Sequence, residues 1–383
     1  MRNSHYRSSI ERKLTRVTGA ATLTGLAAHL AQGIGRIVAD TTIGRLRTLP
    51  RSVAALDAAT LSRITGRTVT SVSILDGDAG TSSRARLALT GDGVPETVFV
   101  KMAAETVPTR LMGELGRLAA TETRFYAELA PGLSGLPRYH GSAFDPLTGR
   151  FVLVLEDLPA DECEFPDTLH PLDKDRAAAL VELLAQLHGR FWAKVPDWLY
   201  TASGDDTSLL TGRLLRTSAR RIAERTSIPV ERGRFIDENY RAVAQLIDRP
   251  PHTVMHGDAH PGNTYFRNGR AGLLDWQAVR RGHPGRELAY TLVTAMDTDD
   301  RRACERDLLD EYRRALAAAG GPELDRDELW ERYRQGALYA YVAALITAGL
   351  GGMQDDAIAL AGLRRAVDAL DDLDTVAILA ESL

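Results

Sequence analysis

The segment His256-Gly257-Asp258-Ala259-His260-Pro261-Gly262-Asn263, followed twelve residues later by Asp275-Trp276-Gln277, is the most informative part of the sequence. In phosphoryl-transfer sites a loop Asp accepts the proton of the attacking hydroxyl. An Asn five residues on and a second Asp hold magnesium ions. We therefore predict that Asp258 is a catalytic base and that Asn263 and Asp275 bind Mg²⁺. The alternative is an ordinary loop, because Asp, Asn and Gly are also the residues that form turns.

A β-hairpin is predicted between the two metal-binding residues. Residues 264–266 form one strand, residues 267–270 form a turn with an Asn-Gly pair, and residues 271–274 form the return strand. Such a hairpin places Asn263 and Asp275 side by side, where both can reach one ion.

Upstream, Lys101 interrupts the apolar run of residues 98–102, which is typical of a buried strand. A buried ammonium needs a partner, and Glu122 is available in the helical pattern of residues 115–129. A strand Lys held by a helix Glu is how kinases bind nucleotide phosphates. The alternative is a surface lysine on an edge strand.

Two further segments have the order expected of a nucleotide site. A hydroxyl-rich turn before Lys101 can cover phosphates with Gly80, Thr81, Ser82 and Ser83, although a plain hairpin turn explains it equally well. After Glu122, the apolar run of residues 151–155 ends in Glu156-Asp157-Leu158, which is predicted to be a hinge that meets the adenine edge.

These elements resemble the aminoglycoside phosphotransferase, choline kinase and ecdysteroid kinase-like superfamily. The resemblance covers about residues 70 to 300. Besides the segments above, it includes His188-Gly189-Arg190-Phe191-Trp192 and Arg286-Glu287-Leu288-Ala289-Tyr290, and the Asp275-Trp276-Gln277 form is most similar to the ecdysteroid kinase-like branch. Two features depart from the family pattern: Glu287 stands where Asp is usual, and the phosphate turn is poor in glycine.

The resemblance implies an α+β, bilobal protein-kinase-like fold that binds ATP and Mg²⁺. We expect a helical N-terminal extension over residues 1–55, a small β-rich N-lobe over 56–157 and a larger, mainly helical C-lobe over 158–383. A helix expected near Glu287 leaves no room for the segment that binds a peptide substrate. The expected activity is phosphorylation of a hydroxyl on a small molecule.

Charge and cysteine usage are ordinary. The net charge of -4 gives no reason to expect a nucleic-acid partner. Cys163 and Cys304 lie far apart in the sequence, and we expect reduced thiols in a cytoplasmic enzyme.

Two apolar segments raise the question of a membrane. Residues 336–353 carry no charge, but their four glycines favour a buried helix. Near the N-terminus an apolar helical stripe follows a basic segment, so an interfacial membrane helix is one interpretation. Packing of the stripe on the kinase core or on a partner subunit is favoured; the stripe comprises Leu23, Leu26, Leu30, Ile34 and Ile37, and the basic residues are Arg2, Arg7, Arg12, Lys13 and Arg16.

Several residues have alternative interpretations. His256 is predicted to brace the loop near Asp275, and Arg280, Arg281 and Arg286 are interpreted as solvated arginines rather than phosphate ligands. Antibiotic phosphorylation is a rival function, which for polycationic acceptors calls for an acidic cleft. A non-catalytic, nucleotide-binding pseudokinase is another. The acidic candidates for such a cleft are Asp297, Asp299, Asp300, Asp355 and Asp356, and the aromatic candidates for an apolar acceptor site are Trp330, Tyr333, Tyr339 and Tyr341.

Overall fold

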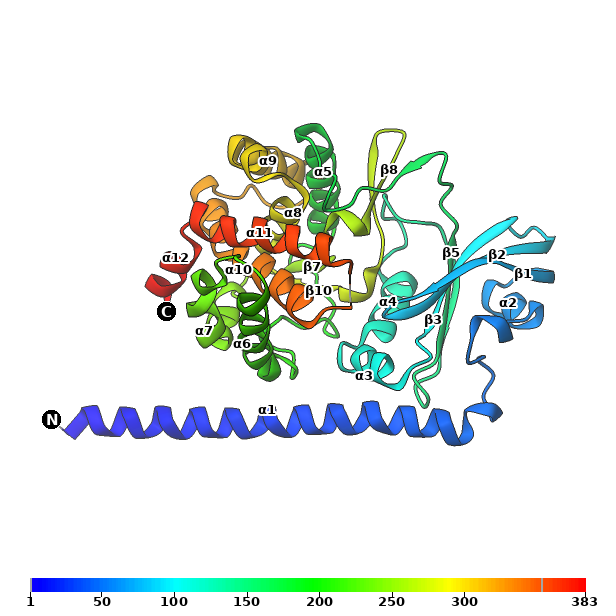
Figure 1. The fold of residues 1–383 in the computed structure, drawn as a ribbon, viewed down its shortest axis with the longest axis horizontal. Helices are drawn as coiled ribbons and strands as arrows, with labels where there is room; N and C mark the ends of the chain where they lie inside the picture. The colour runs from blue at the N-terminus through cyan, green and yellow to red at the C-terminus, as the bar shows by residue number, and fades with distance from the viewer. Residues whose placement is uncertain (1, 353) are drawn as a thin grey trace.

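The computed structural model describes residues 2–352 and 354–383, with side chains for all of these except residues 2–22 and 79. The chain has the expected α+β, kinase-like architecture, with a five-stranded sheet on one side and a mainly helical lobe on the other (Figure 1).

The N-lobe sheet is antiparallel throughout, in the order β1-β2-β3-β5-β4. Alternation of side chains along β5 divides the apolar residues between two cores: Val152 and Val154 face the N-lobe core, whereas Leu153 and Leu155 join the core of the C-lobe. The strands are β1 (Thr68–Ala79), β2 (Ser82–Asp92), β3 (Thr97–Ala103), β4 (Tyr139–Phe144) and β5 (Phe151–Glu156).

Three helices accompany this sheet: α2 (Ala58–Thr65), α3 (Val107–Leu115) and α4 (Leu118–Glu128). Helix α4 belongs to the larger core through Phe125 and Tyr126, which are fully buried. The helix that carries Glu122 is therefore anchored on the C-lobe side of the sheet.

In its described residues the C-lobe has eight helices, a three-stranded sheet in the order β6-β8-β9 and the β7-β10 pair. The strands are β6 (Cys163–Glu164), β7 (Thr253–Met255), β8 (Thr264–Arg267), β9 (Arg270–Leu273) and β10 (Arg280–Gly282). The helices are α5 (Lys174–Arg190), α6 (Ser208–Arg225), α7 (Arg234–Ile247), α8 (Pro284–Ala295), α9 (Thr298–Ala318), α10 (Arg326–Leu350), α11 (Asp356–Asp372) and α12 (Thr375–Ser382). Single 3₁₀ turns lie at Gly44–Leu46, Val53–Ala55, Val230–Gly233, Pro261–Asn263 and Trp276–Ala278.

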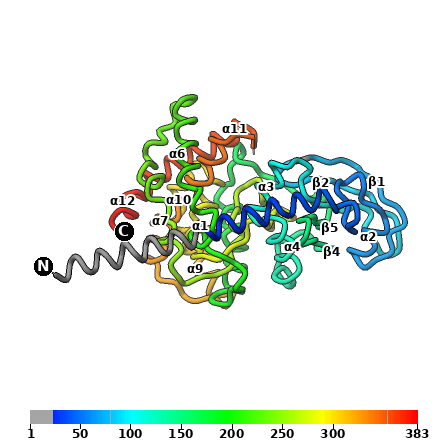
Figure 2. Tube along the Cα trace, turned by 90° about the horizontal axis from the view of Figure 1, so that it is seen from below, coloured from blue at the N-terminus to red at the C-terminus, as the bar shows by residue number. Residues whose placement is uncertain are grey.

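The N-terminal helix α1 (Arg2–Ile43) packs through a face that overlaps the predicted apolar stripe only in part. Within its described part, residues 23–43 run beside α3 (Figure 2). His29 bonds the Glu114 carbonyl at 3.0 Å, and Asp40 pairs with Arg110 and Arg150. These polar contacts determine which face of α1 packs against the N-lobe. Most of the predicted apolar stripe is therefore exposed: Leu23, Leu30 and Ile34 are solvent-accessible, whereas Ile37 is buried. The five basic residues before it lie outside the residues whose side chains are described.

The uncharged segment near residue 336 is largely the C-terminal half of α10, as predicted. Gly336, Tyr341 and Leu345 are buried among neighbouring helices, while Met353 lies outside the described residues. No helix in the described part of the chain is long and apolar enough to span a bilayer. Cys163 and Cys304 are free and buried.

Candidate active site

A buried charge cluster joins β3, α4 and the loop after β9. The Lys101 ammonium lies 2.6 Å from one Glu122 carboxylate oxygen and 2.7 Å from Asp275 Oδ1. Burial alone would lower the pKa of Lys101, but the charges of Asp275 and Glu122 outweigh it and raise the pKa. Burial and the Asp275 charge raise the pKa of Glu122. Burial would also raise the pKa of Asp275, but Lys101 outweighs it and lowers that pKa. Of the two carboxylates, Asp275 is therefore the one whose negative charge Lys101 stabilises more strongly.

The backbone at Asp275 is unusual. Its φ of 59° lies in the left-handed region, which Asp tolerates better than most residues. The next residue, Trp276, holds this conformation because its ring stacks on Phe125 of α4 at 4.0 Å and meets His256 edge-on at 4.5 Å. The turn that presents Asp275 is thus fixed to the helix that carries Glu122.

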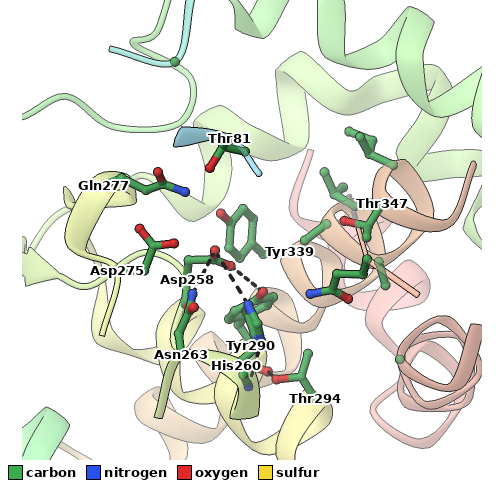
Figure 3. A pocket seen from close by; sticks show the side chains of 18 of the residues that line it. Thr81, Asp258, His260, Asn263, Asp275, Gln277, Tyr290, Thr294, Tyr339 and Thr347 are labelled. Carbon is green, nitrogen blue, oxygen red and sulfur yellow. Dashed lines mark hydrogen bonds and ion pairs between the residues drawn. The ribbon is translucent and has the colours of Figure 1, made fainter. Parts of the chain in front are cut away.

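Asp258 projects into the site from the loop between β7 and β8 (Figure 3). Tyr290 of α8 donates its hydroxyl proton to Asp258 Oδ1 at 2.6 Å. The Asn263 amide donates to Asp258 Oδ2 at 3.2 Å and to its carbonyl at 3.0 Å. Gly257 before it has φ +85°, and a Cβ there would collide with the Ala278 carbonyl, so glycine is required. The carboxylate is oriented from two sides and remains partly open to the cavity.

Two buried side chains, His256 and Glu287, hold the loop that carries Asp258. His256 bonds the Leu274 carbonyl through Nε2 at 2.8 Å and accepts the Asp258 N–H at Nδ1, as its predicted bracing role requires. Burial lowers the pKa of His256, which keeps the ring neutral for this pattern. Glu287 accepts the backbone N–H groups of His256 and Gly257 and lies 2.8 Å from His188 Nε2. The Glu in place of the usual Asp therefore anchors the loop that carries Asp258 to α5.

The predicted hairpin is present between Asn263 and Asp275. Strands β8 and β9 pair with Arg267 opposite Arg270, and Asn268 and Gly269 form the two-residue turn with positive φ angles of 53° and 73°. The Leu274 N–H donates to the Asn263 carbonyl at 2.8 Å. This pairing holds Asn263 and Asp275 next to each other, as predicted.

A cavity of about 360 Å³ lies between the sheet and this hairpin. Its apolar walls include Phe99, Leu155 and Leu274, and Lys101 and Asp275 line its charged end. The predicted hinge residues Glu156, Asp157 and Leu158 line the same cavity. The Glu156 carboxylate pairs with Arg267 and the Asp157 carboxylate with Arg86, both at 2.8 Å, so these side chains are already bound. We name this space the nucleotide cavity.

The hydroxyl-rich turn is shorter than predicted. Gly80 and Thr81 connect β1 to β2, whereas Ser82 and Ser83 already belong to β2 and pair with Ala103 and Met102. Both serines are buried, and none of the four predicted turn residues lines the nucleotide cavity; Gly80 and Thr81 line a second, larger cavity. That these residues cover phosphates stays a prediction. Arg84, which the sequence did not single out, lines the nucleotide cavity instead.

A second cavity of about 620 Å³ opens on the other side of Asp258, and we name it the acceptor cavity. Thr81 lies across this space from Asp258, and the rings of Tyr290 and Tyr339 lie close to Asp258 (Figure 3). The two cavities share four lining residues: Arg84, Gly262, Asn263 and Asp275.

Asp275 and Asn263 fit a magnesium ion that also binds phosphate oxygens. Lys101 occupies Asp275 Oδ1, and the Asn263 amide nitrogen is used by Asp258, so one carboxylate oxygen and one amide oxygen remain for a cation. Among the described residues no group of three His, Cys, Asp or Glu side chains forms a metal site. Magnesium is commonly held by one or two protein oxygens plus substrate phosphates, which matches this pair.

None of the three arginines interpreted as solvated is fully exposed: Arg281 is half-buried and lines neither cavity. Arg286 is 2% exposed and Arg280 half-buried, and both line the acceptor cavity. Of the aromatic candidates, Tyr333 and Tyr341 are core residues and Tyr339 lines the cavity. None of the five acidic candidates for a cationic cleft lines it.

A family model described as the phosphotransferase enzyme family matches residues 77–335. A putative aminoglycoside phosphotransferase from Ralstonia eutropha JMP134 has a similar fold, at 14% identity and TM-score 0.51 over 86% of this chain and 98% of that one. A choline kinase from Streptococcus pneumoniae is 16% identical, with TM-score 0.47 over 80% and 94% of the two chains. A macrolide 2'-phosphotransferase from Brachybacterium faecium is 19% identical, with TM-score 0.43 over 79% and 96%. No curated protein matches the chain significantly.

Proposed function

The chain belongs to the phosphotransferase enzyme family, and we propose that it transfers the γ-phosphoryl group of ATP to a hydroxyl of a small molecule. The observation that carries this proposal is the meeting of the two cavities. Arg84, Asn263 and Asp275 line both, so a nucleotide in one and an alcohol in the other would meet beside Asp258.

The chemistry follows from the groups at that junction. The acceptor oxygen forms a bond to the γ-phosphorus, the bond from that phosphorus to the β–γ bridging oxygen breaks, and ADP leaves with the electron pair. Asp258, held by Tyr290 and Asn263, receives the hydroxyl proton. Lys101 neutralises phosphate charge, and Mg²⁺ held by Asn263 and Asp275 supplies further charge neutralisation when bound.

The size of the acceptor is limited by the chain itself. Helix α8 begins at Pro284, nine residues after Asp275, and its N-terminal residues are buried. That interval leaves no extended segment on which a peptide substrate would lie. A small-molecule acceptor is the better fit to a cavity of about 620 Å³.

The experiment is a turnover assay of the full chain with Mg-ATP and a panel of hydroxylated steroids, choline analogues, sugars and aminoglycosides. Asp258→Ala and Asp258→Asn are expected to lower turnover on any accepted alcohol by about 10²–10⁴-fold, the usual contribution of a positioned base. Nucleotide affinity should be retained. Asp299→Asn, at an exposed aspartate, is the matched control.

Two results would contradict the proposal in different ways. Undetectable nucleotide binding would remove the premise of a kinase. Normal nucleotide binding with equal turnover by wild-type and Asp258→Ala would assign the protein to the pseudokinase class.

A further inference from the structure

The acceptor cavity contains a guanidinium without an anionic partner. Arg280 lies on β10, and its Nε donates to the Ala278 carbonyl at 3.2 Å. No described carboxylate lies within 4.0 Å of it, although it is half-buried and lines the cavity close to the Asp258 loop. Desolvating an unpaired cation is costly, so such a group needs a reason to be there.

Beyond Arg280, further donors on this wall also lack partners. Both terminal nitrogens of Arg286 are buried without a hydrogen bond, and the nearest carboxylate, Asp248, is 3.7 Å away. The Arg286 guanidinium lies 3.9 Å from the ring centre of Tyr339, another residue of the wall. The Ser208 hydroxyl lines the same cavity and is buried without a partner. Unsatisfied buried donors are rare in folded proteins, and their gathering at one cavity points to a ligand.

Each carboxylate of the cavity already has partners within the protein. Asp275 is held by Lys101, and Asp258 accepts bonds from Tyr290 and Asn263. Asp205 accepts the Thr207 N–H and lies 3.7 Å from Arg117. On the wall away from the phosphate junction, Arg280 therefore has no ion-pair partner among the described residues, and the charge of Asp205 reaches it only from beyond 4.0 Å.

We propose that the acceptor is anionic: a hydroxylated molecule whose carboxylate or phosphate group binds Arg280, with Arg286 adding positive charge from behind. This inference rests on the proposed function, because it names the substrate class of the same site. The planar guanidinium fork matches both carboxylate and phosphate oxygens. Val342, Ile346 and Ile358 line the same cavity and provide an apolar surface for the remainder of the molecule.

The test is a calorimetric titration of the full chain saturated with Mg-ADP, with four probes of equal chain length. They are ω-hydroxyoctanoate, its methyl ester, ω-hydroxyoctyl phosphate, and the ω-hydroxyoctyl trimethylammonium ion. The acid and the phosphate ester are expected to bind at least tenfold more tightly than the neutral ester and the cation. Comparing the acid with the phosphate identifies which anion the site prefers.

Arg280→Gln should remove this preference while leaving the affinity for Mg-ADP unchanged. Arg280→Lys should restore part of it, because the charge returns without the fork. The matched control is Arg281→Gln, since Arg281 is the next residue of β10 and does not line the cavity.

The outcomes separate the two proposals. Failure to bind Mg-ADP would contradict the proposed function. Normal Mg-ADP binding with equal affinity for all four probes, including no detectable binding of any, would overturn the anionic acceptor. Tighter binding of the trimethylammonium probe would overturn it too, and would favour a cationic acceptor.

Discussion

The two cavities that meet near Asp258 differ in how their charged side chains are paired. In the nucleotide cavity the charges are paired within the protein: Lys101 with Glu122 and Asp275, Glu156 with Arg267, and Arg86 with Asp157. In the acceptor cavity Arg280 has no ion-pair partner among the described residues, and Arg286 and Ser208 have buried donors without a hydrogen bond. A paired cluster orders its own geometry before a ligand arrives, whereas an unpaired wall is completed by the ligand. A preordered cavity suits the common phosphate donor ATP, whereas a wall completed by its ligand suits selection among acceptor molecules.

Among the variants that test this comparison, breaking the paired cluster is expected to have the largest effect. Lys101→Met keeps an unbranched side chain, one atom shorter, but removes the ammonium between Glu122 and Asp275. We expect kcat/KM for ATP to fall by about 10²–10³-fold, the range for losing one preorganised charge. Nucleotide affinity from calorimetry and steady-state rates measure this loss.

The control for Lys101→Met must separate two effects of losing the ammonium: repulsion between Glu122 and Asp275, and weaker binding of the nucleotide phosphates. The double variant Lys101→Met, Glu122→Gln also removes the repulsion between the Glu122 and Asp275 carboxylates that loss of the ammonium would leave. Recovery of thermal stability without recovery of nucleotide affinity supports the assignment. Recovery of both would mean that Lys101 serves the fold alone.

An unpaired carboxylate behind the acceptor wall gives a pH-dependent test. Asp237 lies on α7, one helical turn before the cavity residue Tyr240; it is 4% exposed, and its Oδ1 has no hydrogen-bond partner. Burial raises the pKa of Asp237 to about 7. The unfolded chain releases this proton near its ordinary pKa of 3.8, so stability is lost as pH rises from about 4 to 7.

Asp237→Asn should abolish that loss. Between pH 5 and 7 the wild-type free energy of unfolding should fall, relative to the variant, by roughly 2–3 kcal/mol. Urea unfolding at several pH values measures the difference, with the exposed Glu224→Gln as control. A pH-independent difference would show that Asp237 is ionised in the folded state.

Part of the nucleotide cavity could be predicted from the sequence, whereas the wall of the acceptor cavity could not. Lys101 and Glu122 were recognisable because a lysine inside an apolar strand demands a partner, and the β8–β9 hairpin because Asn268-Gly269 fixes its turn. The acceptor cavity collects residues from Gly80 to Gly362, whose approach depends on helix packing and not on local pattern.

Particular errors have the same origin. Arg280 and Arg286 were interpreted as solvated because charge alone does not reveal burial. On α1, Ile37 of the apolar stripe is buried as expected, but Asp40 and His29 make polar contacts that an apolar pattern does not reveal. Ser82 and Ser83 were included in the turn because hydroxyl residues suit turns and strands alike.

The smallest expected effect concerns Tyr290, which the sequence could not link to a base 32 residues away. Burial raises the pKa of Tyr290 well above its ordinary value, so its hydroxyl remains a donor to Asp258 at 2.6 Å. Tyr290→Phe removes that single bond, and we expect kcat to fall about tenfold, equal to about 1.4 kcal/mol, with KM for ATP unchanged. The matched control is Tyr339→Phe, because Tyr339 lies 5.2 Å away ring to ring and donates to the Gly257 carbonyl at 2.9 Å instead. If Tyr290 orients the base, Tyr290→Phe alone changes the pH profile of kcat; equal profiles in both variants would limit Tyr290 to packing.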